Sequence, residues 1–174
     1  MEVSSSSQVN DTSWKPPLVG LVKINTDETI DAGSGKVGIC IIIRNGDGKV
    51  IASGAQVVLA RFSPLVAESV ALLKGLQLGL SVGVLPCVIE SDALGVVNLV
   101  TVGHPSRSDV GLVIQDVLQI LKQFPDCFVV FTPMKTNMAA HDLAKLGLTI
   151  DSDLVLLEDF PPCVASIVSG DRPN

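Results

Sequence analysis

The spacing of apolar residues changes once along this chain, after its first third, and this change limits the possible folds more than any other feature. Before it, the runs 23–27, 36–44 and 49–59 are β-branched or alternate between apolar and polar residues, a pattern typical of strands. The segment Asn45-Gly46-Asp47-Gly48 joins the last two runs as a tight turn, since glycine and Asn or Asp accept positive φ. With a loop over 29–35, these runs predict an antiparallel meander of three strands.

After Ser63-Pro64 the apolar residues recur at helical spacing as far as about residue 82, with Ser63 expected as the N-cap. The elements expected beyond that helix are a strand at 86–89, helices at 93–101 and 109–123, a strand at 128–131, and a helix at 137–146 capped by Asn137. The order β-β-β-α-β-α-α-β-α predicts an α/β fold. Its mixed five-stranded sheet would combine the antiparallel meander with two parallel strands and carry helices on both faces.

The ends of the chain differ in composition from its middle. Residues 1–13 are polar and rich in serine, which predicts a disordered tail. Residues 149–174 are acidic and then rich in Pro and Ser, which predicts a C-terminal tail packed loosely on the surface. The expected domain therefore spans 14–148, long enough to bury one core.

Cysteine usage and the absence of sorting signals favour an intracellular protein, nuclear or cytoplasmic. No two cysteines form a CxxC pair, so a zinc site is not expected. Three cysteines in apolar runs are expected to be buried and reduced: Cys40, Cys87 and Cys127. Residues 1–13 show no signal or transit peptide, and the apolar stretch around 75–89 is too interrupted to span a membrane.

Three acidic residues stand where apolar neighbours predict burial. Asp27 ends the first predicted strand, Asp92 follows the fourth, and Glu68 lies near the start of an otherwise apolar helix. If the first and fourth strands are parallel neighbours, both aspartates reach the same edge of the sheet. Carboxylates gathered there repel one another unless cations neutralise them, and Mg²⁺ or Mn²⁺ prefer such oxygen ligands. Two such ions about 4 Å apart can hydrolyse a phosphodiester.

Each of these acids also has an ordinary structural interpretation. Asp92 is in a position typical of a turn or helix cap, Glu68 can complement a helix dipole, and Asp27-Glu28 can form a solvated acidic loop. The net charge of −6 and the pI of about 4.7 also oppose binding to a polyanion. The residues alone leave both interpretations open.

An ordered set of short stretches gives the chain a family resemblance over about 14–148. They include Trp14-Lys15-Pro16-Pro17, Lys23-Ile24-Asn25-Thr26-Asp27, Arg44-Asn45-Gly46-Asp47-Gly48, Ala67-Glu68, Glu90-Ser91-Asp92 and Asn137-Met138-Ala139-Ala140-His141-Asp142. With them the chain resembles the plant-type ribonuclease H-like domain, a reverse-transcriptase-like module related to retroelement sequences.

The resemblance implies a metal-dependent endonuclease that cleaves the RNA strand of RNA–DNA hybrids with two Mg²⁺ or Mn²⁺ ions. It implies Asp27, Glu68 and Asp92 as metal ligands and catalytic residues. The fourth acid of the family falls on His141, which the resemblance therefore implies as the remaining ligand. Asp142 is a less favoured substitute, since one residue along a helix rotates a side chain by about 100°.

Three departures from the family pattern support a second hypothesis. Glu28 stands where the family has glycine, His141 adds no negative charge, and the loop 132–136 lacks a histidine that many active relatives use to shuttle protons. Lys135 and Asn137 are the candidate contacts to RNA–DNA hybrid or RNA. The alternative is thus a catalytically impaired module that binds nucleic acid or a protein partner, or a retroelement remnant with no activity.

Overall fold

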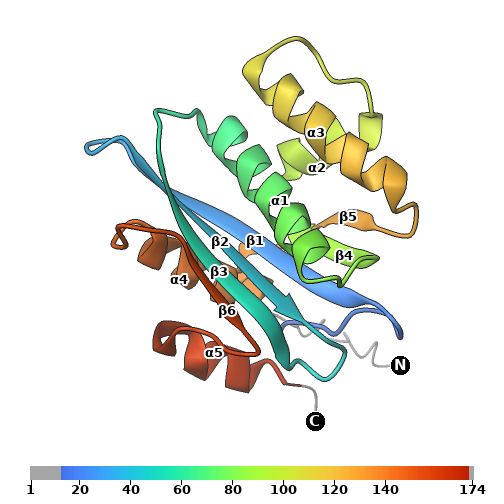
Figure 1. The fold of residues 1–174 in the computed structure, drawn as a ribbon, viewed down its shortest axis with the longest axis vertical. Helices are drawn as coiled ribbons and strands as arrows, with labels where there is room; N and C mark the ends of the chain where they lie inside the picture. The colour runs from blue at the N-terminus through green and yellow to red at the C-terminus, as the bar shows by residue number, and fades with distance from the viewer. Residues whose placement is uncertain (1–12, 173–174) are drawn as a thin grey trace, which may run out of the picture.

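The computed structural model describes residues 13–172, which build one sheet between two layers of helices (Figure 1). The predicted N-terminal tail lies outside the described residues, except for Ser13. The strands are β1 (Val22–Asp31), β2 (Lys36–Arg44), β3 (Val50–Leu59), β4 (Cys87–Ser91), β5 (Phe128–Phe131) and β6 (Leu154–Leu157). The sheet order is β5-β4-β1-β2-β3-β6, with β4 parallel to β1 and β5, and every other pair antiparallel.

Three helices cover one face of the sheet and two cover the other. On the first face lie α1 (Pro64–Ser81), α2 (Leu94–Val102) and α3 (Asp109–Gln123), and on the second lie α4 (Met138–Gly147) and α5 (Ala165–Gly170) (Figure 1). Short 3₁₀ turns precede the last two helices, η1 (Met134–Thr136) before α4 and η2 (Pro162–Val164) before α5. The predicted α/β class is confirmed, and so is the predicted order of strands and α-helices as far as α4. None of the helices in residues 13–172 is long and apolar enough to cross a membrane.

The hairpin and the first helix form as their local sequences predict. The Asn45 side chain accepts hydrogen bonds from the backbone N–H groups of Asp47 and Lys49, and Gly48 takes a φ of +73°. Ser63 accepts a hydrogen bond from the N–H of Val66, so it caps α1 as expected. These signals act within a few residues, which is why they can be identified from the sequence.

The first strand is longer than predicted. Pairing with β2 continues to Asp31, so Asp27 lies in the middle of β1 and does not end it. The loop expected over 29–35 shortens to 32–35, where the Asp31 carboxylate accepts hydrogen bonds from Gly33 and Ser34.

The C-terminal segment corrects the predicted sheet. Within residues 13–172 the sheet has six strands and not five, because 154–157 pair antiparallel with 52–55 of β3. Val164 and Val168 are fully buried in the apolar cluster beneath α4, so this segment is not loosely packed. Cys40 and Cys87 are buried and free as expected, whereas Cys127 is only half-buried.

Two glycines let α4 lie very close to the sheet. A Cβ atom on Gly38 of β2 would lie 2.2 Å from the carbonyl oxygen of Ala144. A Cβ atom on Gly147 would lie 2.8 Å from the carbonyl oxygen of Gln56. Both distances are too short for any side chain, so glycine at these positions sets the height of α4 above β1 and β2.

Candidate metal centre

Parallel pairing of β1 and β4 brings Asp27 and Asp92 together. The register pairs Asn25 with Glu90, and β4 then ends at Ser91 while β1 continues. Two residues further along, Asp27 on β1 therefore lies beside Asp92, just beyond the end of β4. Both strands were expected to end at this edge of the sheet. In the structure only β4 ends there, and β1 continues to Asp31.

Glu68 of α1 completes a cluster of three carboxylates. One oxygen each from Asp27, Glu68 and Asp92 lie within 4.8 Å of one another. Glu68 is the fifth residue of α1 and lies beyond its first turn. Asp92 does not cap α2, because the N-cap residue is Ala93 and no side chain makes a capping hydrogen bond there. The structure thus gathers the three acids, with Glu68 beyond the first turn of α1 and Asp92 in the bend between β4 and α2 without a capping role.

The environment of this cluster disfavours negative charge. Asp27 is only 3% exposed. Burial, then the charge of Asp92, raises the pKa of Asp27 to about 6. Burial, then the charges of Asp27 and Asp92, raises the pKa of Glu68 to about 9. Without a counter-charge Glu68 therefore retains its proton near neutral pH.

The cluster also contains polar atoms that lack a partner within the protein. Among the described residues, Glu68 Oε2 and Asp92 Oδ1 are buried and accept no hydrogen bond. A buried carboxylate oxygen without a partner is costly, and a bound cation would remove that cost. Because all three donors are carboxylates, the site fits Mg²⁺ or Mn²⁺.

His141 adjoins the cluster from the opposite face of the sheet. Its Nδ1 lies 2.9 Å from Asp27 Oδ2, while Asp27 Oδ1 accepts the N–H of Glu28 at 2.8 Å. Asp142 turns away and pairs with Lys145 at 2.9 Å. His141 is thus the α4 residue positioned to orient Asp27.

The two candidate nucleic-acid contacts differ in accessibility. Lys135 is exposed in η1. Asn137 is 1% exposed and occupies the predicted N-cap position of α4, but its side chain makes no capping hydrogen bond. Its side-chain amide donates instead to the carbonyl oxygen of Thr26 at 2.9 Å. That hydrogen bond ties the start of α4 to β1, next to Asp27.

The sequence analysis missed a buried polar network beside the cluster. The Asn25 side chain accepts hydrogen bonds from Trp14 Nε1 at 3.1 Å and Arg44 Nη2 at 3.0 Å, and donates to Glu90 at 2.8 Å. Lys23 pairs with Glu90. Polar residues at alternate positions of β1 were the available signal, but alternation equally describes a solvated face.

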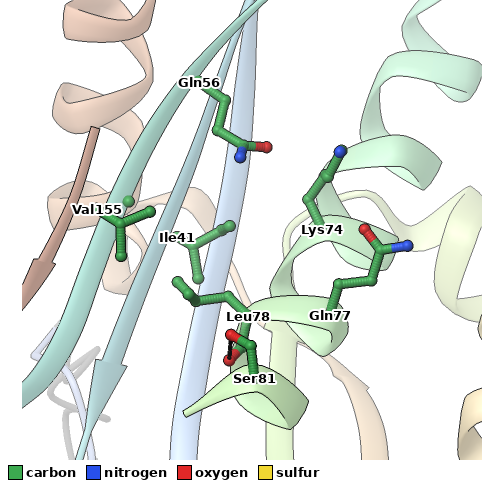
Figure 2. Close-up of a pocket in the computed structure, with 8 residues that line it drawn as sticks. Ile41, Gln56, Lys74, Gln77, Leu78, Ser81 and Val155 are labelled. Carbon is green, nitrogen blue, oxygen red and sulfur yellow. Dashed lines mark hydrogen bonds between the residues drawn. The ribbon is translucent and has the colours of Figure 1, made fainter. Parts of the chain in front are cut away.

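A pocket of about 190 Å³ lies elsewhere, between the C-terminal half of α1 and strands β3 and β6 (Figure 2). Figure 2 shows the polar ends of Gln56, Lys74 and Gln77 around it. No carboxylate lines this pocket, so it is separate from the candidate metal centre.

Comparisons with known proteins agree with the fold. A family model described as reverse transcriptase-like matches residues 25–147. No curated protein sequence matches the chain. Ribonuclease H1 from the archaeon Halobacterium salinarum matches with a TM-score of 0.68 and 23% identity, over 75% of this chain and 98% of that one.

Two further solved structures are similar. The ribonuclease H domain of Rv2228c from Mycobacterium tuberculosis matches with a TM-score of 0.66 and 22% identity, over 74% of this chain and 93% of the solved chain. LC11 ribonuclease H1, isolated from compost and solved with an RNA/DNA hybrid, matches with a TM-score of 0.65 and 18% identity, over 74% of this chain and 96% of that one.

These comparisons establish the fold and the family, while a plant-type or retroelement origin receives no support from them. The family model covers well over half of the chain and includes Asp27, Glu68, Asp92 and His141. The chain therefore belongs to the reverse transcriptase-like family and has the ribonuclease H-like fold.

Proposed function

We propose that this protein is a metal-dependent endonuclease that cleaves the RNA strand of RNA–DNA hybrids. The observation that carries the proposal is the convergence of three carboxylates within 4.8 Å, one buried and two half-buried. Two of them have an oxygen that accepts no hydrogen bond from the described residues. The similarity to LC11 ribonuclease H1, which was solved with an RNA/DNA hybrid, supports this substrate class.

Asp27, Glu68 and Asp92 would hold two Mg²⁺ or Mn²⁺ ions, with His141 contributing through Asp27. When bound, the ions supply activation of water and stabilisation of the leaving oxygen, so no nucleophilic side chain is needed. The protein fixes the positions of the carboxylates: Asp27 is held between the His141 ring and the Glu28 N–H. Asp27 is buried, so its attraction for a cation is stronger than it would be in water.

The direct test is cleavage of a labelled RNA–DNA hybrid by the purified protein with Mg²⁺ or Mn²⁺. Cleavage is expected for the wild type and should disappear in Asp27→Asn, a variant of nearly identical shape. Asp142→Asn is the matched control, because it removes a carboxylate close to the site that pairs with Lys145. Absence of metal-dependent cleavage by the wild type, or cleavage that survives in Asp27→Asn, would overturn the proposal.

The second candidate is a catalytically impaired module that binds nucleic acid or a protein partner. Two observations favour it: a histidine stands in place of the fourth family acid, and the net charge is −6. This module would bind hybrid in a gel-shift assay, with affinity falling steeply as salt increases, yet leave it uncut. No binding at low salt would leave only a protein partner.

A further inference from the structure

Glu28 follows Asp27 on β1 and lies on the face of the sheet that α1 covers. Successive residues of a strand point to opposite faces, and cross-strand partners share a face. Asp27 pairs with Cys40, which hydrogen-bonds to α4, so Asp27 points toward α4. Glu28 pairs with Ile39, which packs with residues of α1. Glu28 and Glu68 therefore lie on the same side of the sheet.

The Glu28 carboxylate, like those of Glu68 and Asp92, has a buried oxygen without a hydrogen-bond partner among the described residues. These oxygens are Glu28 Oε2, Glu68 Oε2 and Asp92 Oδ1. Burial, then the charges of Asp27 and Asp92, raises the pKa of Glu28 to about 7, and the charge of Glu28 adds to the causes that raise the pKa of Glu68. All four carboxylates thus share one partly buried environment.

The charge balance of the site leaves room for a fourth carboxylate. Two divalent cations carry four positive charges, whereas Asp27, Glu68 and Asp92 together carry three negative charges when ionised. A histidine side chain such as that of His141 carries no negative charge in either protonation state. We propose that Glu28 is a fourth carboxylate of the metal centre, reaching it from the α1 side and supplying the negative charge that His141 does not. This inference rests on the proposed function.

The measurement is isothermal titration of MnCl₂, without substrate, into the wild type, Glu28→Gln and Asp142→Asn at pH 8. Glu28→Gln preserves the shape of the side chain and removes its charge. It is expected to weaken Mn²⁺ binding by about tenfold, or to lower the number of ions bound from two to one. Asp142→Asn removes an equal charge nearby and is expected to bind within twofold of the wild type. A melting curve for each variant checks that the fold is retained.

The outcomes separate this inference from the proposed function. If the wild type binds Mn²⁺ and cleaves hybrid while Glu28→Gln binds equally well, Glu28 is no part of the centre and the proposed function stands. Tighter binding by Glu28→Gln would show that Glu28 obstructs the site, which also overturns the inference. If Asp142→Asn weakens Mn²⁺ binding as much as Glu28→Gln does, the effect comes from the overall charge near the site, and the inference is overturned. A wild type that neither binds Mn²⁺ nor cuts hybrid would overturn both.

Discussion

The imidazole Nδ1 of His141 on α4 lies 2.9 Å from the carboxylate Oδ2 of Asp27 on β1. The other oxygen of Asp27 accepts the backbone N–H of Glu28. Each carboxylate oxygen has two lone pairs, so both oxygens retain capacity for a cation after these contacts. The His141 ring therefore orients Asp27 and still leaves its carboxylate able to bind a cation. For this reason His141 is the most informative residue to change.

Replacing His141 by aspartate should strengthen metal binding and lower the stability of the metal-free protein. His141→Asp restores a fourth acid, so Mn²⁺ affinity in titration calorimetry should rise by about tenfold. The same added charge faces Asp27 when no metal is present, so the metal-free melting temperature should fall. The rise in melting temperature on adding Mn²⁺ should then exceed that of the wild type.

His141→Asn serves as the comparison, because it keeps a polar side chain without adding charge. Weaker Mn²⁺ binding by His141→Asp than by His141→Asn would contradict the proposed role of this position.

The stability of the metal-free protein should depend on pH because the acids of the metal centre have raised pKa values. Unfolded carboxyls titrate near pH 4, whereas burial and mutual repulsion raise the pKa of Asp27 to about 6, Glu28 to about 7 and Glu68 to about 9. Between about pH 4 and pH 9 these carboxyl groups bind more protons in the folded protein than in the unfolded chain. The free energy of unfolding therefore falls as pH rises. The metal-free melting temperature should therefore decrease from pH 5 to pH 9, and added Mn²⁺ should reverse the loss at high pH.

Glu68→Gln isolates the contribution of the most strongly shifted group. Its melting temperature should depend less on pH than that of the wild type, above all between pH 7 and 9. Parallel curves for the two proteins would show that Glu68 does not carry the effect.

The sequence predicted the elements whose signals are local, together with the gathering of the three acids. The turn at 45–48 and the Ser63 cap each depend on hydrogen bonds within a few residues. The meeting of Asp27 with Asp92 required only that β1 and β4 be parallel neighbours.

The features that were missed depend on contacts between distant segments. Strand β6 is four residues long and pairs with residues about a hundred positions earlier, which no local pattern encodes. The Asn137 amide resembles a helix cap in sequence, but in the fold it reaches the Thr26 carbonyl. Glu28 was recognised as a departure from the family, yet its position relative to α1 required the strand register.

Removing the Asn25 side chain should destabilise the protein strongly. Asn25→Ala leaves Trp14 Nε1, Arg44 and Glu90 without their shared partner in a buried site. The expected loss in free energy of unfolding is about 3 kcal/mol, measured by urea denaturation. Asn98→Ala, at an exposed position of α2, should change it by about 0.5 kcal/mol or less. Similar effects for the two variants would mean that the network contributes little.

The C-terminal segment should contribute to folding as part of the core. Val168 is 1% exposed beneath α4, so Val168→Ala leaves a cavity and should cost about 2 kcal/mol. Ser169→Ala alters the exposed side of the same helix and should be close to neutral. A neutral Val168→Ala would instead fit the loosely packed tail that the composition suggested.

Gly38 should be required for both stability and the metal centre. An alanine there places a Cβ atom 2.2 Å from the Ala144 carbonyl oxygen and 2.9 Å from the Leu148 nitrogen, both backbone atoms that cannot rotate away. Gly38→Ala should therefore cost about 2–3 kcal/mol and lift α4 from the sheet. Because His141 is carried by α4, Mn²⁺ affinity should fall as well.

Gly46→Ala is the matched control, since an added Cβ atom meets nothing within 4 Å and the position has no positive φ. Its free energy of unfolding should stay within about 0.5 kcal/mol of the wild type. Its Mn²⁺ affinity should stay within about twofold. A Gly38→Ala protein that is destabilised yet binds Mn²⁺ normally would separate the height of α4 from the metal centre. In that case the contact between His141 and Asp27 would not be needed to hold the ions.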